Sequence, residues 1–225
     1  MKNSKRLSQL ATMVKYPYPH IWDCCCDHGF LGIELLKQQH KKVGESERQS
    51  NIHFVDIVPT IMTQLSEKLS RHFLHQPLWH VHCLDVASLP LSEYPVSERH
   101  LIIIAGVGGE LTQWFVKAIV AQNPQHQLEF LLCPLRQHYQ LRKTLSELDL
   151  RLVDEQLLQE NKRFYEMIHV TSDQNYPEVS LVGNKMWHGS GAVGQAYLSR
   201  TLTHYQKQQG QSLAEVKAYQ QVIID

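Results

Sequence analysis

Two hydrophobic periods alternate along the first 150 residues of the chain. Short apolar or alternating runs, typical of β-strands, occur at residues 20–25, 51–56, 78–85, 101–105 and 128–133. Segments with apolar residues three and four apart, typical of amphipathic helices, occur at residues 4–14, 30–42, 59–73, 111–120 and 139–148. Five alternating strand–helix units predict a doubly wound α/β fold with a mostly parallel sheet.

The pattern changes after residue 148. Residues 150–158 and 163–171 are rich in β-forming residues and predict an antiparallel hairpin that closes the sheet. Residues 191–208 and 212–224 have apolar residues at helical spacing, so we expect two helices joined around Gly210. We therefore predict a Rossmann-like domain at residues 1–172, and a linker with a helical hairpin at residues 173–225. The hairpin could dock on the core, form a homodimer or bind a substrate.

Acidic residues end the first three predicted strands. Asp23, Asp56 and Asp85 are expected at the carboxyl edge of the sheet, where ligands of open α/β sheets bind. These acids suit S-adenosylmethionine: the first turn for its amino-acid end, the second acid for the ribose hydroxyls and the third for the adenine amino group. The fourth strand ends in glycines at residues 106–109, which let a ligand approach the backbone. NAD is disfavoured because G-x-G-x-x-G does not follow the first strand, and the phosphate-binding loop is likewise absent.

Three blocks of sequence carry a resemblance to a known family. Residues 23–31, DCCCDHGFL, are similar to D-I-G-S-D-H-A-Y-L; residues 104–109, IAGVGG, to I-A-G-M-G-G; and residues 160–167, ENKRFYEM, to E-x-x-K-x-Y-E-I. Their order and spacing agree over about residues 5–170. On these residues the chain resembles the bacterial tRNA (adenine-22-N1)-methyltransferases of the TrmK type, which also carry a C-terminal helical pair. The resemblance implies a class I S-adenosylmethionine-dependent enzyme that methylates N1 of an adenine in tRNA.

The resemblance also implies roles for individual residues. Asp27 is the candidate catalytic residue, because a carboxylate beside the methylated base can accept its proton or stabilise its positive charge. The cofactor-binding candidates are Asp23, Cys24, Cys25, Asp27, His28, Gly29, Asp56, Ile57, Asp85, Val86, Ala105 and Gly106. The substrate-binding candidates are Val107, Gly108, Gly109, Pro134, Arg136 and Tyr165. Tyr165 could stack on the base or pack the hairpin.

Two places depart from the family pattern. Cys25 and Cys26 replace Gly and Ser in the first turn, and Leu135-Arg136 follows Pro134 where the family commonly has Asn. These departures leave two alternatives open: a non-catalytic binding module with the same fold, and a methyltransferase that acts on another substrate. A metal site that combines the cysteine triplet with His28 is disfavoured, because structural zinc sites space their cysteines by two to four residues.

The charge and composition of the chain limit which partners it is expected to bind and where in the cell it is expected to function. Lys+Arg and Asp+Glu number 22 each, so binding of tRNA requires a local basic surface. Its candidates are Lys2, Lys5, Arg6, Lys15, Arg136, Arg142, Lys143, Lys162 and Arg163. The 14 histidines are expected to be scattered over the surface. An odd number of cysteines, three of them consecutive, favours a reduced cytoplasmic setting, and no signal peptide or membrane-spanning run is expected.

Overall fold

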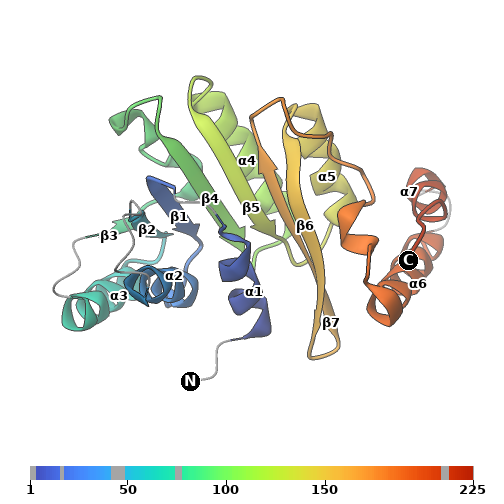
Figure 1. Ribbon diagram of the computed structural model, residues 1–225, viewed down its shortest axis with the longest axis horizontal. Coiled ribbons are helices and arrows are strands. Elements are labelled where there is room, and N and C mark those ends of the chain that lie inside the picture. The colour runs from blue at the N-terminus through green and yellow to red at the C-terminus, as the bar shows by residue number, and fades with distance from the viewer. Residues whose placement is uncertain (1–3, 16–17, 42–48, 74–77, 209–212, 225) are drawn as a thin grey trace.

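A computed structural model of the chain describes residues 4–15, 18–41, 49–73, 78–208 and 213–224. Lys2 and Gly210, and the ends of predicted ranges at residues 1, 42, 212 and 225, lie outside these described ranges. The described part is built around one seven-stranded sheet with the strand order β3-β2-β1-β4-β5-β7-β6. Figure 1 shows helices on both sides of this sheet and a helical pair beyond its β6 edge.

The five predicted parallel strands are confirmed. They are β1 (His20–Cys24), β2 (Asn51–Asp56), β3 (Trp79–Cys83), β4 (Arg99–Ala105) and β5 (Gln127–Cys133). Along the chain the sheet grows from β1 through β2 to β3, and then restarts on the other side of β1 with β4 and β5. The carboxyl ends of β1 and β4 therefore lie next to each other at the point where the strand order reverses, which is the usual ligand-binding position in such sheets.

The predicted hairpin is also confirmed. Strands β6 (Arg151–Glu160) and β7 (Arg163–Thr171) pair antiparallel, and β7 pairs antiparallel with β5. Only Asn161 and Lys162 connect them, with φ of 49° and 61°. Two consecutive left-handed residues are typical of a two-residue turn whose twist matches that of the strands. Strand β7 has the predicted bounds, and β6 ends two residues later than predicted, so the connection is a two-residue turn.

Helices cover both faces of the sheet. On one face, α1 (Lys5–Met13), α2 (Phe30–Lys41) and α3 (Pro59–His72) pack over a core that includes Phe54 and Ile103. On the other, α4 (Gly109–Gln122) and α5 (His138–Glu147) pack over a core that includes Trp22 and Ile102. The three-layer arrangement of a doubly wound, Rossmann-like fold follows from these two apolar faces.

The predicted count of five complete strand–helix units is too high by one, because no helix range was predicted between β3 and β4 and no α-helix is present there. The connection from β3 to β4 contains two 3-10 helices, η1 (Val86–Ser88) and η2 (Leu91–Glu93), and no α-helix. Pro90 and Pro95 lie in this segment, and a proline lacks the N–H that a continuous helix requires. The short connection covers only part of the sheet face above β2 and β3.

Histidines occupy that face, contrary to the expectation that they are scattered over the surface. The histidine cluster consists of His20, His53, His80, His82, His100 and His126, and is packed with Trp22 and Tyr94. A ring nitrogen of His53 lies 3.0 Å from one of His20, and the other lies 3.0 Å from one of His82. His20 also contacts the Glu98 carboxylate at 2.7 Å. The sequence places only His80 and His82 together, on one strand, because the other members come from different parts of the chain.

The two C-terminal helices dock on the chain's own core. Helices α6 (Gly191–Gln206) and α7 (Leu213–Tyr219) pack around Tyr139, Trp187 and Tyr197, beyond the β6–β7 edge. The Tyr197 hydroxyl donates a hydrogen bond of 2.6 Å to Glu166 on β7. Arg142 lies beneath this contact and is wholly buried, paired at 2.7 Å with Glu155 and at 2.8 Å with Glu166. The prediction that Arg142 belongs to an exposed basic surface is therefore wrong.

Candidate active site

The acidic rim is formed at the carboxyl ends of β1, β2 and β3, and we define it as Asp56, Asp85 and the turn at residues 25–29. The two oxygens of Asp56 accept hydrogen bonds from the backbone N–H groups of Asp27, at 3.1 Å, and Val58, at 3.2 Å. Asp85 is exposed, and its carboxylate accepts the N–H of Ala87 at 2.8 Å. These bonds leave lone pairs on both carboxylates for a ligand. The rim thus presents fixed acceptors at adjoining strand ends.

The turn after β1 has the backbone shape that glycine usually provides. Cys25, Asp27 and Gly29 have φ of 54°, 49° and 69°. Two backbone hydrogen bonds hold the turn, from Cys26 to the carbonyl of Val55 at 3.1 Å and from Gly29 to the carbonyl of Cys26 at 2.8 Å. A side chain at Cys25 therefore costs about 1–2 kcal/mol of left-handed strain, but the turn keeps its form.

Burial and nearby acids keep the Cys25 thiol protonated. They raise its pKa to about 12, with burial first and then the carboxylates of Asp56, Asp23 and Asp85. The Cys25 side chain therefore occupies this edge as a neutral group.

Several predicted cofactor residues contribute in a different way from that expected. Asp23 is buried beneath the turn, where its carboxylate accepts the N–H of Gly32 at 2.9 Å, and burial raises its pKa to about 7. Cys24 and Val86 belong to the core of the sheet. Their side chains support the rim rather than line it. Asp27, His28 and Ile57 are exposed, and the Asp27 carboxylate lies 3.7 Å from a His28 ring nitrogen.

A glycine turn at residues 106–109 follows β4 beside the rim. Gly106 has a φ of 85° and donates its N–H to Cys133 at 3.2 Å, while the carbonyl of Val107 accepts the N–H of Leu135 at 2.9 Å. A Cβ on Gly109 would collide with the backbone oxygen of Arg136. The ends of β4 and β5 are thus held together by contacts that only glycine permits.

Two arginines flank the glycine turn. A Cβ built on Gly108 would lie 3.4 Å from the guanidinium of Arg136, and one on Gly106 would lie 3.7 Å from each terminal nitrogen of Arg6. The Arg6 guanidinium is 5.3 Å from the centre of the half-buried Tyr165 ring. Sequence analysis placed Arg6 only among the surface cations, because nothing in its local pattern shows that α1 reaches the end of β4.

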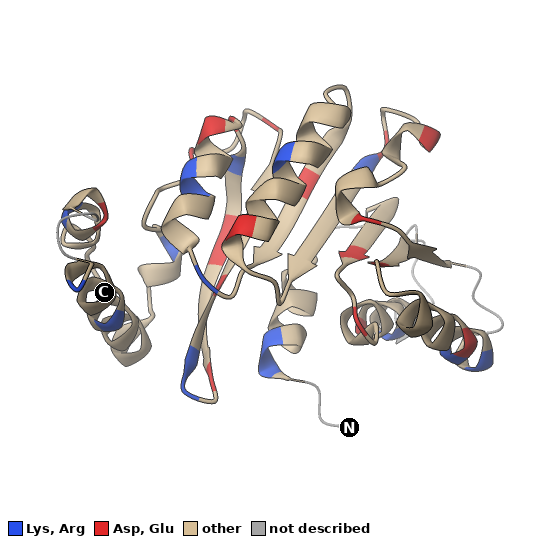
Figure 2. Cartoon of the chain, turned by 180° about the vertical axis from the view of Figure 1, so that it is seen from behind, with Lys and Arg blue, Asp and Glu red and all other residues tan. Residues whose placement is uncertain are grey.

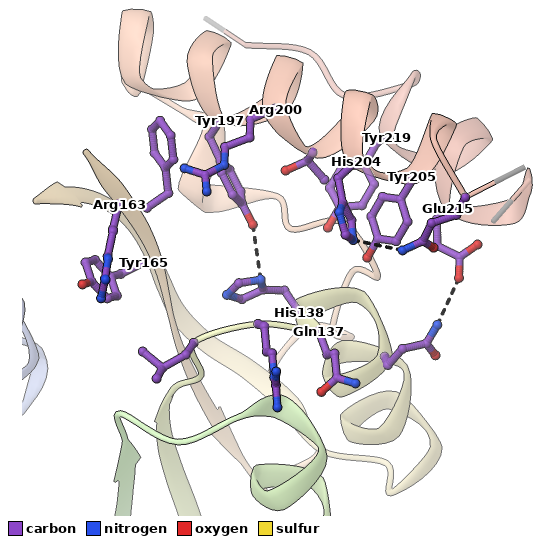
Figure 3. A pocket seen from close by; sticks show the side chains of 16 residues that line it. Gln137, His138, Arg163, Tyr165, Tyr197, Arg200, His204, Tyr205, Glu215 and Tyr219 are labelled. Carbon is purple, nitrogen blue, oxygen red and sulfur yellow. Dashed lines mark hydrogen bonds between the residues drawn. The ribbon is translucent and has the colours of Figure 1, made fainter. Parts of the chain in front are cut away.

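A cavity of about 770 Å³ continues from Arg136 and Tyr165 toward the C-terminal helices. We call it the C-terminal cleft (Figure 3). It is lined by Leu135, Arg136, Gln137, His138, Gln140, Arg163, Phe164, Tyr165, Tyr197, Arg200, Thr201, His204, Tyr205, Gln208, Glu215 and Tyr219. Of these, sequence analysis named only Arg136, Tyr165 and, as a surface cation, Arg163. The spacing of 197, 200, 201, 204, 205 and 208 marks one helical face, and this signal could have revealed the rest.

Basic and aromatic side chains approach one another across this cleft. Arg163 and Tyr165 extend from β7, and Arg200 and His204 extend from α6 (Figure 3). Figure 2 shows basic positions at the tip of the β6–β7 hairpin, on α1 and on the C-terminal helices. The cleft therefore offers a local positive surface to a chain with zero formal net charge.

Two features are absent from the part of the chain that the structure describes: a metal-binding cluster and a membrane-spanning helix. No three His, Cys, Asp or Glu side chains there are placed to share a metal ion. The five cysteines are free thiols. None of the described helices has the length and apolar character that crossing a bilayer requires.

Comparison with known proteins assigns the family. The profile of a methyltransferase domain matches residues 3–168, which is most of the chain. The protein belongs to this methyltransferase family. The match of the methyltransferase domain runs from α1 into β7, so it includes the rim and the glycine turn. No curated protein matches the sequence.

Solved structures resemble the methyltransferase over almost its whole length. A candidate tRNA (m1A22) methyltransferase of Streptococcus pneumoniae, in complex with S-adenosylmethionine, has 19% identity, a TM-score of 0.72, and coverage of 97% of this chain and 98% of its own. TrmK of M. capricolum, in complex with S-adenosylhomocysteine, has 13% identity, a TM-score of 0.70 and coverage of 98% and 94%. The m1A22 tRNA methyltransferase TrmK of B. subtilis has 20% identity, a TM-score of 0.64 and coverage of 97% and 92%. The shared fold includes the C-terminal helices.

Proposed function

We propose that this methyltransferase transfers a methyl group from S-adenosylmethionine to N1 of an adenine in tRNA. The observation that carries the proposal is one continuous surface: the acidic rim, the glycine turn beside it, and the C-terminal cleft that begins at Arg136 and Tyr165. Solved structures with this fold, whose descriptions name tRNA (m1A22) methylation, support it. The expected cytoplasmic location remains a prediction.

The rim fits the proposed cofactor. Asp85 and Asp56, on adjoining strands, would bind the adenine amino group and the ribose hydroxyls, because both keep free acceptor capacity. The left-handed backbone at Cys25 retains the turn that would face the amino-acid end. Asp23 would act through its support of α2, since its carboxylate is occupied by Gly32. When bound, the cofactor supplies an electrophilic methyl group.

Residues of this chain would then position the base. Adenine N1 is a nucleophile that lies inside a Watson–Crick pair, so the base must be exposed or flipped to react. We place the flat ring of the base beside the glycine turn, next to the rim, where the Arg6–Tyr165 pair and Arg136 flank the backbone. Alignment of N1 with the methyl carbon is the main contribution of such a site. Asp27, exposed on the rim, would accept a proton from the methylated base or stabilise its charge.

The C-terminal cleft supports a nucleic-acid substrate. Arginines and aromatic rings on opposite walls can contact phosphates and unpaired bases. We therefore propose residues 173–225 as a substrate-binding appendage of the domain at residues 1–172. Affinity for tRNA should fall steeply as salt is added, because phosphate contacts release counterions. Homodimerisation through the same helices stays a prediction.

A nucleoside analysis tests the proposal. The purified protein is incubated with methyl-labelled S-adenosylmethionine and total bacterial tRNA, and the tRNA is then digested and its nucleosides separated. Labelled 1-methyladenosine is the expected product, and its absence from the Asp27→Asn variant is the control. Label in a different nucleoside would contradict the adenine N1 assignment and leave the methyltransferase assignment in place.

A second candidate is a binding module that has lost methyl transfer. The side chain of Cys25, in a backbone conformation that favours glycine, is the observation that favours it. Titration calorimetry with S-adenosylmethionine separates the two functions. A folded protein that binds no cofactor would favour this alternative over the enzyme.

A further inference from the structure

Arg6 reaches the end of β4 from the first turn of α1. Its two terminal nitrogens lie equally close to Gly106, and its guanidinium stacks on Tyr165 of β7. Its side chain also lowers the pKa of the Cys133 thiol, which burial raises, so its positive charge acts at the end of β5 as well. The charged group of Arg6 therefore stands where β4, β5 and β7 come together.

The backbone of α1 holds Arg6 in this place. The N–H groups of Lys5 and Arg6 donate to the two oxygens of Glu160, at 2.7 and 3.3 Å. The side chain of Ser4 caps the helix by accepting the N–H of Leu7 at 3.2 Å. Because the first turn is anchored to the β6–β7 hairpin at Glu160, the Arg6 side chain starts from a fixed point and is preorganised.

The Arg6 guanidinium combines partial burial with the lack of an acidic partner among the described residues. The other described arginines without a carboxylate contact, Arg136, Arg163 and Arg200, are exposed. Arg99, Arg142 and Arg151 each contact a carboxylate. For Arg6, the described residues provide a ring and a glycine backbone, but no hydrogen bond or ion pair to the guanidinium. A half-buried cation without an acid is costly unless a ligand supplies the negative charge. The site is therefore built for an anion.

The order of the strand ends indicates which anion this is. The edge runs from β3 with Asp85, through β2 with Asp56 and the turn of β1, to β4 with Gly106. A cofactor with its adenine at Asp85 and its ribose at Asp56 has its amino-acid end at β1 and β4, beside Arg6. That end carries a carboxylate, which the acids at the end of β1, Asp23 and Asp27, would not favour without a compensating cation. A guanidinium matches a carboxylate with two parallel N–H donors.

We propose that Arg6 binds the carboxylate of the cofactor's amino-acid end, with Tyr165 fixing the plane of the guanidinium. This inference rests on the proposed function, because it requires S-adenosylmethionine at the acidic rim. It assigns α1, which precedes the Rossmann-like strands, a direct part in cofactor binding. It also gives the partly buried Tyr165 ring a role, which is to hold the Arg6 guanidinium in position.

Two ligands that differ in the carboxylate test this role by titration calorimetry. S-adenosylhomocysteine has the amino-acid end, and 5′-methylthioadenosine keeps the nucleoside thioether without it. For Arg6→Gln we expect the affinity for S-adenosylhomocysteine to fall about 10- to 100-fold, the usual effect of losing a charged hydrogen-bonding partner. The affinity for 5′-methylthioadenosine should change less than about twofold, and Arg6→Lys should be intermediate because it keeps the charge but not the fork.

Matched controls separate this role from others. Lys5→Gln changes an exposed cation on the same turn and should leave both affinities unchanged. Equal losses for both ligands in Arg6→Gln would mean that Arg6 only supports the fold, and would overturn the inference. Unchanged binding of S-adenosylhomocysteine with weakened tRNA binding would assign Arg6 to a phosphate and would also overturn it. If the wild-type protein bound neither ligand, the proposed function itself would fail; wild-type binding with an unaffected Arg6→Gln variant would overturn the role of Arg6 alone.

Discussion

The acidic rim and the histidine cluster share strands β1 to β3, yet they place their ionisable side chains in opposite environments. At the rim, Asp27 and Asp85 are exposed, and backbone N–H groups hold Asp56 and Asp85 in place. In the cluster, His53 and His100 are fully buried among rings. Charged groups persist where water or a ligand reaches them, whereas groups in the interior are stable only when neutral. One sheet can thus carry a polar ligand site and a stacked core of imidazoles.

The largest expected effect is on catalysis at the rim. Asp27→Asn should lower the rate of methyl transfer by about 10²- to 10⁴-fold, since it removes the proposed proton acceptor. Asparagine tolerates the left-handed backbone of this position, so the turn should survive. The measurement is the initial rate with labelled cofactor and tRNA.

Asp149→Asn is the matched control for this change, because Asp149 also has a positive φ, of 56°, and lies outside the rim. It should leave the rate unchanged. A rate in Asp27→Asn equal to that of the wild type would remove Asp27 from the mechanism.

Acid should destabilise the histidine cluster. Burial, followed by the neighbouring imidazoles of His80, His82, His20 and His100, lowers the pKa of His53 to about 2; burial, followed by His20 and His126, lowers that of His100 to about 3. A histidine whose folded pKa lies below its unfolded value of 6.5 contributes stability above that pH, which is lost as the pH falls through 6.5. Between pH 7.5 and 5.5 the contribution of each histidine to the unfolding free energy should fall by about 1.4 kcal/mol, or about 3 kcal/mol together; the raised pKa of Asp23 acts in the opposite direction.

Urea unfolding at the two pH values measures this drop. His53→Gln should be less stable at pH 7.5 but should lose only about half as much stability on acidification, because one neutral histidine has been removed. His28→Gln changes an exposed histidine at the rim and should keep the wild-type loss. An unaltered loss in His53→Gln would show that the cluster does not set the acid sensitivity.

A smaller effect is expected on cofactor affinity at Asp56. Asp56→Asn should weaken binding of S-adenosylhomocysteine by about 10- to 100-fold, because an amide retains only one acceptor oxygen while the backbone N–H groups of Asp27 and Val58 both require one. Calorimetry gives the dissociation constant. Asp154→Asn, which changes a carboxylate paired with Lys15 away from the rim, should bind like the wild type; an equal loss in both variants would argue against a specific rim contact.

The smallest expected effect is on stability, at two neighbouring cysteines: Cys25 lies in the strained turn and Cys24 in the core. Cys25→Gly should raise the unfolding free energy by about 0.5–1 kcal/mol, because glycine relieves the strain of a φ of 54° at some entropic cost. Cys24→Ala should lower it by about 1 kcal/mol, because it opens a space in the core above β1. Thermal and urea unfolding provide the comparison, and a stabilising Cys24→Ala would contradict it.

Local periodicity explains why most of the fold could be predicted. The run 101–105 and the alternation in 51–56 are set by which residues face the core, and this information lies within each segment. The connection after β3 is also set locally: no helix range was predicted there, and Pro90 and Pro95 lie within it. The acids at strand ends were also predictable, because parallel strands bring their carboxyl ends to one edge.

Burial could not be predicted in the same way. Arg142 has the sequence context of a surface cation, yet Glu155 and Glu166 from a different hairpin enclose it. Asp23 has the sequence context of a rim ligand, yet its carboxylate accepts a hydrogen bond from the Gly32 N–H near the start of α2. In each case the partner comes from a separate element, and only chain packing brings the two together.

The sequence by itself determined the strands and helices, the parallel sheet, and the kinds of chemical group along its carboxyl edge, because hydrophobic spacing and strand ends are local properties. Only the tertiary structure decided that Arg6 reaches Gly106, that histidines from separate strands stack into one cluster, and that α6 forms a wall of a cleft with β7. These contacts join residues far apart in the chain. Their existence depends on the twist of the sheet and on the docking of helices, which no single segment encodes.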